Sequence, residues 1–146
     1  MKPSHRVFSL WISLLFLSCQ GLWAQAAFPS SEGERVRYAV QIEFARGYIS
    51  GVCILLYDGL DVRGSLFNEF GISVMDFSYR PAKDKVKLHS VQKMLDKWYI
   101  RKRLRRDLRE VIHVLQQGGT QYTDEKYHIR FRFTPMGEEQ ETVHAK

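Results

Sequence analysis

The chain has 146 residues, 45% of them hydrophobic and 26% charged, and its 22 Lys and Arg outnumber its 16 Asp and Glu for a formal net charge of +6. This length suits one domain with a hydrophobic core, and the absence of internal repeats and low-complexity segments argues against a repeat architecture. The excess of positive charge indicates an anionic partner.

The first 26 residues have the three parts of a secretory signal peptide. Lys2 and Arg6 precede an uncharged apolar run at 7–18, and small residues stand at Ala24 and Ala26. The run is shorter than the about 20 residues that a membrane-spanning helix needs. We therefore expect cleavage after Ala26 and export to the periplasm, in solution or associated with the outer membrane. Export argues against nucleic acid, the partner that a basic chain would otherwise suggest.

An alternative cleavage site lies inside the same segment. The run Leu15-Phe16-Leu17-Ser18-Cys19 is similar to a bacterial lipobox, in which cleavage precedes the cysteine and its thiol is lipidated. Ser18 is small, as such a site requires, but Phe16 occupies a position where these sites favour leucine. If this site is used, Cys19 carries a lipid anchor. Otherwise Cys19 only ends the apolar region of an ordinary signal peptide.

Cleavage after Ala26 leaves 120 residues, which we divide into a single domain at 27–136 and a polar C-terminal tail at 137–146. Cys53 is the only cysteine of this part, so it has no partner for an intramolecular disulfide. It lies in the apolar run from Val52 to Leu56, where a cysteine usually acts as a small buried hydrophobic residue. No histidine or basic residue beside it in sequence would activate the thiol.

The first half of the domain has the alternation of an antiparallel β-sheet. From Arg35 to Phe44, apolar and polar residues alternate strictly, which predicts one buried face and one wet face. The next segment is apolar on both faces, as a central strand is, and Asp58-Gly59 predicts a hairpin turn after it. We expect five strands joined by short turns, at about 35–44, 48–57, 61–67, 72–79 and 86–91.

The period then changes to that of an amphipathic helix. Five apolar residues follow helical spacing within a stripe about 100° wide: Leu104, Leu108, Val111, Ile112 and Leu115. Gly118-Gly119 is placed to end this helix with a left-handed cap. Met94, Leu95 and Trp98 are also helically spaced, but their stripe is rotated by roughly 100°. This rotation predicts a kink, or two helical pieces, joined near Tyr99 to Arg101.

A last strand is indicated by the alternation from Tyr127 to Phe133. Together the segments predict an α+β fold: a curved antiparallel β-meander of about five strands, then a long, kinked amphipathic helix, then a final β-strand. From Gly137 onward the chain is polar, and we expect its end to fray.

The positive charge is concentrated on the predicted helix, where residues 97–109 include seven basic side chains and one acidic side chain. One interpretation is a solvated helix face with weak i,i+4 pairs such as that of Arg103 with Asp107, each worth only about 0.2–0.5 kcal/mol. The other is a binding surface for anionic lipid or for an acidic envelope protein. The predicted residues of such a surface are Lys97, Arg101, Lys102, Arg105, Arg106 and Arg109.

The sequence contains no catalytic or metal-binding pattern. The HExxH, GxSxG and CxxC motifs and a glycine-rich phosphate loop are all missing. Asp76 and Glu69 are the only carboxylates set among apolar neighbours, and a small hydrolase built on them is a remote alternative. We predict a binding protein rather than an enzyme, without cofactor or metal, because the remaining histidines show no ligand spacing. These are His89, His113, His128 and His144.

Glycines punctuate the predicted meander, in Ile49-Ser50-Gly51, Gly64-Ser65-Leu66-Phe67 and Phe70-Gly71-Ile72, and a long helix follows. This order resembles the Lol-type lipoprotein carriers and receptors of Gram-negative envelopes, over about Ile49 to Leu115. The resemblance implies a half-open curved sheet whose concave apolar face, covered by helices, receives acyl chains. The chain is short for that family, so some strands would be missing, and no functional residue of the family maps onto a position here.

Two functions of different classes follow. In the first, the domain binds lipid or an acyl chain in a cleft between sheet and helix, with Arg101, Arg105 and Arg109 near the anionic head group. In the second, the apolar residues form an ordinary filled core, and the protein is an assembly subunit that docks on an acidic partner through the basic helix. The predicted cleft residues are Phe67, Phe70, Met75, Phe77, Met94, Leu95 and Trp98.

Overall fold

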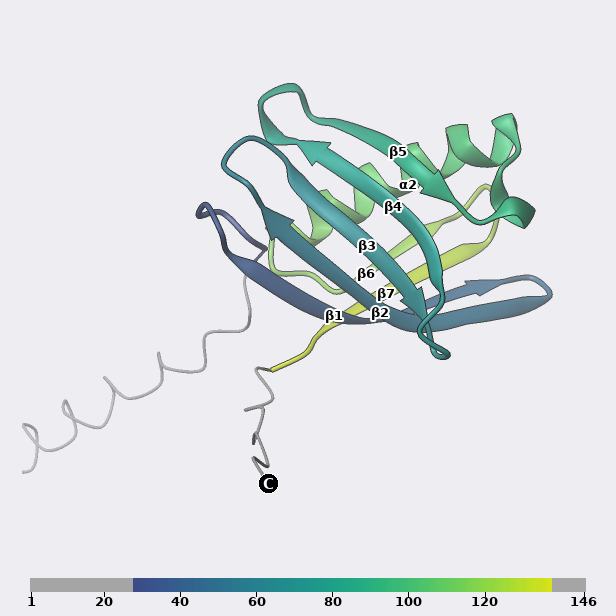
Figure 1. Ribbon diagram of the computed structural model, residues 1–146. Helices are drawn as coiled ribbons and strands as arrows, with labels where there is room; N and C mark the ends of the chain where they lie inside the picture. The colour runs from purple at the N-terminus through teal and green to yellow at the C-terminus, as the bar shows by residue number, and fades with distance from the viewer. Residues whose placement is uncertain (1–27, 138–146) are drawn as a thin grey trace, which may run out of the picture.

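A seven-stranded antiparallel sheet curls around one long helix in the computed structural model, which describes residues 28–137 (Figure 1). The predicted α+β class and the curved meander are confirmed. The signal segment, the alternative lipidation site at Cys19 and the C-terminal tail lie outside the described residues. The strand order is β5-β4-β3-β2-β1-β7-β6, so β5 and β6 form the two edges of the sheet.

The meander consists of five consecutive strands, each within one residue of its predicted bounds at either end. Strict alternation makes β1 the clearest of them, because its apolar residues Val36, Tyr38, Val40 and Ile42 are all buried on the concave face. The strands are β1 (Arg35–Phe44), β2 (Gly47–Tyr57), β3 (Val62–Asn68), β4 (Ser73–Arg80) and β5 (Lys85–Val91).

Two glycines allow neighbouring strands to approach closely where the sheet curls. A Cβ on Gly51 of β2 would lie 1.8 Å from the backbone carbonyl oxygen of Phe67, and a Cβ on Gly64 of β3 would lie 2.2 Å from the ring of Phe77. The pairing register also shifts between Leu66 and Phe67. Such irregularities bend a sheet locally, so close approach and bulge together account for the curl.

The helical region has two pieces, a 3-10 turn η3 (Lys93–Leu95) and the helix α2 (Trp98–Gln116). The break lies at residues 96–97, so its predicted place near Tyr99 to Arg101 was wrong. The predicted glycine cap is confirmed, because Gly118 has a φ of 82° and the Gly119 N–H donates to the carbonyl of Val114 at 2.9 Å. No helix within the described region is long and apolar enough to cross a bilayer.

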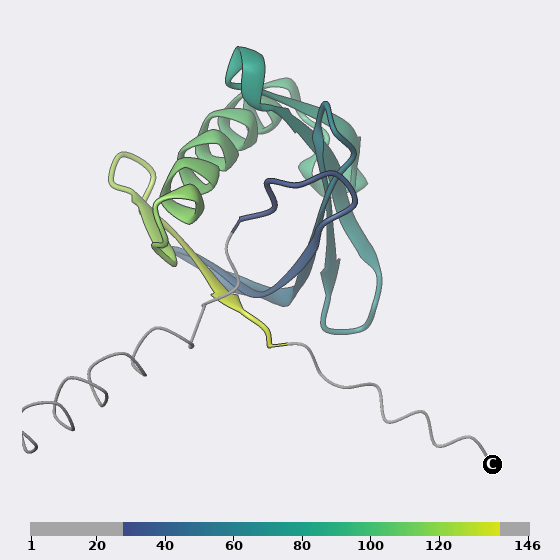
Figure 2. The same ribbon diagram turned by 90° about the vertical axis from the view of Figure 1, so that its left-hand side faces the viewer.

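After the helix the chain forms two strands, β6 (Gln121–Asp124) and β7 (Ile129–Pro135), where the sequence predicted one. The short β6 pairs only with β7 and has no apolar alternation that would reveal it. β7 pairs with β1 in antiparallel register, with Ile42 opposite Phe131. This pairing extends the sheet beyond β1, and the curl of the sheet brings β6 beside the helix (Figure 2).

The half-barrel has two different ends. Residues 28–34 cross one of them, which we call the proximal end (Figure 2). Phe28 and Pro29 are buried there, and the centroid of the Phe28 ring lies 6.4 Å from that of the Tyr79 ring. Because the strands are antiparallel, the β1–β2, β3–β4 and β6–β7 turns and the start of α2 all lie at the opposite, distal end. The distal end is at the right of Figure 1.

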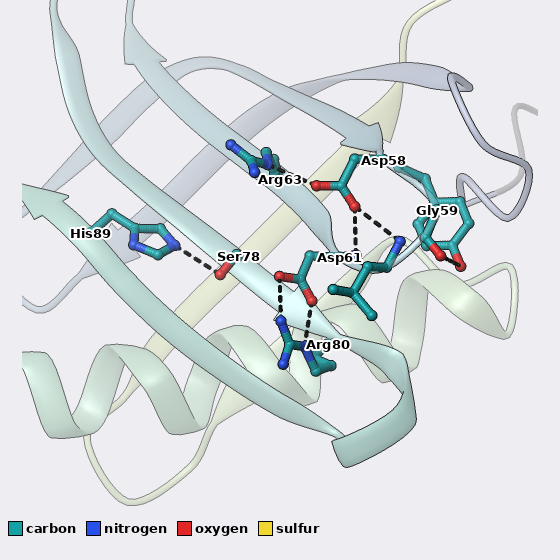
Figure 3. A network of polar contacts seen from close by, with 9 residues as sticks. Asp58, Gly59, Asp61, Arg63, Ser78, Arg80 and His89 are labelled. Carbon is teal, nitrogen blue, oxygen red and sulfur yellow. Dashed lines mark hydrogen bonds and ion pairs between the residues drawn. The ribbon is translucent and has the colours of Figure 1, made fainter.

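Polar contacts on the outer face fix the turn between β2 and β3 at the proximal end (Figure 3). Asp58 accepts hydrogen bonds from the N–H groups of Asp61 and Leu60 and from Arg63, and these bonds lower the pKa of Asp58 to about 2. Arg80 of β4 donates two hydrogen bonds to Asp61, at 2.7 and 3.1 Å. The predicted hairpin at Asp58-Gly59 is therefore confirmed, with a polar network that ties it to β4.

Candidate ligand-binding site

A pocket of about 660 Å³ lies at the distal end, between the first three turns of α2 and the concave face of the sheet. This volume is within the range of about 300–1,000 Å³ typical of small-molecule sites. Ile42 and Phe131 form its floor, and both are almost fully buried. Trp98, Tyr99 and Tyr127 border it and are exposed, so the mouth of the pocket faces the distal solvent.

Three of the seven predicted cleft residues line this pocket: Met75, Leu95 and Trp98. Phe67 does not, because it alternates with the inward-facing Leu66 and therefore lies on the outer face of β3. Phe70 does not either, because it lies at the tip of the β3–β4 turn and is 79% exposed.

The two other predicted cleft residues also lie away from the pocket. Phe77 is buried in the core, where its ring covers the space left by Gly64 on the neighbouring strand. Met94 lies on the 3-10 turn before α2 and is 71% exposed. Helical spacing placed Met94 with Leu95 and Trp98, but the break at residues 96–97 separates them.

Sequence reasoning missed the pocket residues that come from the two distal hairpins. Ile42, Phe44 and Ile49 belong to the β1–β2 hairpin, and Tyr127 and Ile129 belong to the β6–β7 hairpin. The first group carried a usable signal, since a two-residue turn at Ala45-Arg46, just before Gly47, places Ile42 opposite Ile49. The second group carried none, because nothing local in the sequence indicates that β7 pairs with β1.

A buried ion-pair cluster joins α2 to β6 beside the pocket. Arg103 donates to the carboxylate of Asp124 at 2.5 Å, lies 3.7 Å from Asp107, and stacks on the ring of Tyr127 at 3.7 Å. Asp107 and Asp124 are almost fully buried. The predicted i,i+4 pair of Arg103 with Asp107 is therefore present, inside the protein rather than on a solvated face.

The pKa values of the two carboxyl groups in this cluster are shifted in opposite directions. Burial and the neighbouring Asp124 raise the pKa of Asp107 to about 7, while the hydrogen bonds from Arg103 and Asp107 outweigh burial and lower the pKa of Asp124. No donor within the described region reaches the oxygens of Asp107. A protonated Asp107 that donates to the Asp124 carboxylate explains both observations.

We expect the Asp107→Asn variant to gain stability over the wild-type protein as the pH rises. The folded-state pKa of Asp107 lies above its unfolded value near 3.8, so its contribution to stability is favourable at low pH and is lost between about pH 4 and pH 7. Asparagine keeps a donor toward Asp124 and never ionises. Urea unfolding should show a relative gain of about 1–3 kcal/mol from pH 5 to pH 8. A Glu125→Gln control, at an exposed site, should show none.

A basic surface extends along the exposed side of α2 and across the edge strand β5. Four of the six predicted anion-binding residues line one shallow hollow there, together with two lysines of β5 that the sequence reasoning did not include. Alternation places these lysines on the same face of β5, opposite to the face on which Val86 is buried. The basic surface comprises Lys85, Lys87, Lys102, Arg105, Arg106 and Arg109.

The two other predicted anion-binding residues lie outside the basic surface. Arg101 is half-buried and pairs with Asp96 at 2.8 Å, so its charge is partly neutralised. Lys97 is the exposed residue that precedes α2. Within residues 28–137, Lys102, Arg105 and Arg106 form no ion pair, whereas Arg109 lies 3.8 Å from Glu110.

The remaining candidate groups lie elsewhere. Cys53 is buried and burial raises its pKa to about 12, which agrees with its predicted role as a core residue. Asp76 accepts a hydrogen bond from Ser65 on the outer face, and Glu69 accepts one from Ser50 at the distal end. Among the described side chains, no group of three or more His, Cys, Asp or Glu is arranged to hold a metal ion.

Comparisons of the chain with models of protein families, with curated proteins and with solved structures found no match.

Proposed function

We propose that this protein is an exported envelope protein that binds an anionic amphiphile, holding its acyl chain in the distal pocket and its head group on the basic surface. The resemblance to Lol-type carriers leads to the same class of ligand. In this proposal the protein binds and carries the ligand and does not transform it.

One observation supports the proposal above the others: Lys102 and Arg106 line both the apolar pocket and the basic surface. The two features therefore share a border on α2, where an apolar chain and an anionic head group of one molecule are both accommodated. Lys102 and Arg106 are exposed and unpaired within residues 28–137. A carboxylate or phosphate there gains charge-assisted hydrogen bonds without displacing an existing partner.

The interior of the pocket suits a hydrocarbon chain. Aliphatic and aromatic side chains from β1, β2, β4, β7 and α2 supply most of its lining. Arg103 and Asp107 also border it, but Arg103 is held by Asp124 and Asp107 is neutral over much of the range below pH 7. The buried cluster therefore presents little free charge to a bound chain.

Binding of 11-(dansylamino)undecanoic acid, a fluorescent fatty acid, tests the proposal. We expect saturable binding with a blue shift of the dansyl emission. The Ile100→Trp variant, which fills the pocket from α2, should abolish binding. The Lys102→Gln/Arg106→Gln variant should weaken it about tenfold, through loss of head-group contacts.

Two controls make the result specific. Leu60→Trp adds the same bulk at an exposed position of the proximal end, and Arg35→Gln/Arg37→Gln removes the same charge from β1. Both should bind the probe as the wild-type protein does. Unchanged binding by Ile100→Trp would place the chain outside the pocket. An absence of binding by the wild-type protein would favour the assembly subunit with a filled core.

A further inference from the structure

The exposed apolar side chains gather at the distal end. Among residues 28–137, ten large hydrophobic side chains are exposed, and all except Leu56 and Leu60 lie there. They come from four separate segments that the antiparallel topology brings to one end, at the right of Figure 1. We call six of them, with at least one from each segment, the apolar rim: Tyr48, Phe70, Ile72, Met94, Trp98 and Tyr127.

The fold does not require these side chains to be apolar. In the β3–β4 turn, the Asn68 side chain accepts hydrogen bonds from the N–H groups of Phe70 and Ile72, at 3.0 and 2.9 Å, and Gly71 supplies a φ of 77°. Asn68 and Gly71 thus set the turn, while the Phe70 ring remains 79% exposed. A single exposed apolar residue is ordinary, but a group of them at one end of a molecule marks an interaction surface.

The charge around the apolar rim is positive. Asp96 and Glu43 at this end are already paired, with Arg101 and Arg130. Within the described region, two carboxylates at this end form no ion pair, those of Glu69 and Glu125. Five basic side chains at the same end also form none, so positive charge is in excess. These five are Arg46, Lys93, Lys97, Lys102 and Lys126.

We propose that the distal end docks on the surface of an anionic lipid bilayer, with the apolar rim inserted among the head groups. Aromatic side chains interspersed with lysine and arginine are typical of the membrane–water interface. Each basic residue near an anionic surface contributes to binding, and no hydrophobic helix is needed. Four separated tips with net positive charge are complementary to such a fluid anionic surface, and the pocket mouth then faces the bilayer. This docking does not depend on a chain occupying the pocket.

Trp98 is a built-in reporter, because the other tryptophans of the chain are Trp11 and Trp23. In full-length protein carrying Trp11→Phe and Trp23→Phe, addition of vesicles of phosphatidylcholine and phosphatidylglycerol should shift the Trp98 emission to the blue. The protein should co-sediment with these vesicles, and added salt or pure phosphatidylcholine should weaken the binding. Unchanged Trp98 emission under conditions of co-sedimentation would overturn the proposal.

Variants locate the docking surface. Phe70→Ser and Met94→Ser should each weaken vesicle binding about tenfold, because each removes a large apolar group from the interface. Leu60→Ser is the matched control, since it removes a 58% exposed apolar group at the proximal end, and it should bind as the wild-type protein does. If Arg105→Gln/Arg106→Gln/Arg109→Gln abolishes binding while Phe70→Ser and Met94→Ser retain it, the membrane contacts the basic helix instead and the proposal fails.

Binding of the fatty-acid probe allows membrane docking and acyl-chain binding in the pocket to be tested independently. Phe70→Ser should still bind 11-(dansylamino)undecanoic acid, since Phe70 does not line the pocket, and Ile100→Trp should still bind vesicles. If the wild-type protein binds the fatty-acid probe but does not bind vesicles, only the docking proposal is refuted. If the wild-type protein binds vesicles but does not bind the probe, only the acyl-chain pocket is refuted.

Discussion

Replacing Arg103 with methionine is expected to lower the free energy of unfolding by about 3–5 kcal/mol at neutral pH, because it leaves buried carboxyl groups without their cation. Arg103 is 19% exposed, whereas its partners Asp107 and Asp124 are 1% and 4% exposed. Methionine replaces most of the aliphatic volume, so the loss reports on charge rather than on a cavity. Urea denaturation followed by circular dichroism measures it.

The pH dependence of this loss distinguishes the ion pair from simple packing. In the wild-type protein the lowered pKa of Asp124 contributes stability above its unfolded pKa near 3.8, and this contribution is lost as the pH falls. The Arg103→Met variant lacks that contribution, so the difference in stability between the two proteins should persist down to about pH 4 and narrow as the pH falls below 3.8. Arg105→Met on the exposed face of the same helix should change stability by less than about 0.5 kcal/mol. Equal losses for both variants would contradict the distinction between the buried cluster and the basic surface.

Gly51→Ala is expected to cost about 3 kcal/mol or to prevent folding, because the new Cβ would meet backbone rather than a movable side chain. That Cβ would lie 1.8 Å from the Phe67 carbonyl oxygen, so β2 and β3 would have to separate. Thermal unfolding of the purified protein, or its recovery in the soluble fraction, measures the effect.

Gly47→Ala is the matched control for this substitution. A Cβ at Gly47, at the start of the same strand, has no atom within 4 Å and no left-handed backbone angle to strain. The free energy of unfolding of the Gly47→Ala variant should differ from that of the wild-type protein by less than about 1 kcal/mol. If Gly51→Ala is equally well tolerated, close approach of β2 and β3 is not what curls the sheet.

The order of elements followed from period and turn chemistry. Strict alternation located β1, and Asp58-Gly59 and Gly118 located a hairpin and a helix end, because each of these signals is local. The second strand after the helix was missed for the opposite reason. β6 is four residues long, polar, and ordered only by its pairing with β7, a tertiary effect that no local pattern reveals.

The candidate site was predictable only in part. Helical phase predicted the exposed face of α2, and Lys102, Arg105, Arg106 and Arg109 do share one surface. The pocket depends on strand pairing, which brings Ile129 and Phe131 beside Ile42. It also depends on which face of the sheet each side chain occupies, and Phe67 lies on the outer face, away from the pocket. Bulk and hydrophobicity alone did not distinguish an inward-facing aromatic from one on the outer face or at a turn tip.

The acyl-chain pocket is tested most directly by methyl NMR of protein labelled at isoleucine δ1 during titration with unlabelled dodecanoate. Four isoleucines line the pocket, whereas Ile54, on the outer face of β2, and Ile112, on the buried side of α2 and more than one turn beyond the pocket-lining part of the helix, do not. We predict saturable shift changes at the pocket methyls of Ile42, Ile49, Ile100 and Ile129, with Ile54 and Ile112 unchanged. Unchanged pocket methyls at saturating dodecanoate, or changes centred on Ile54, would contradict the account.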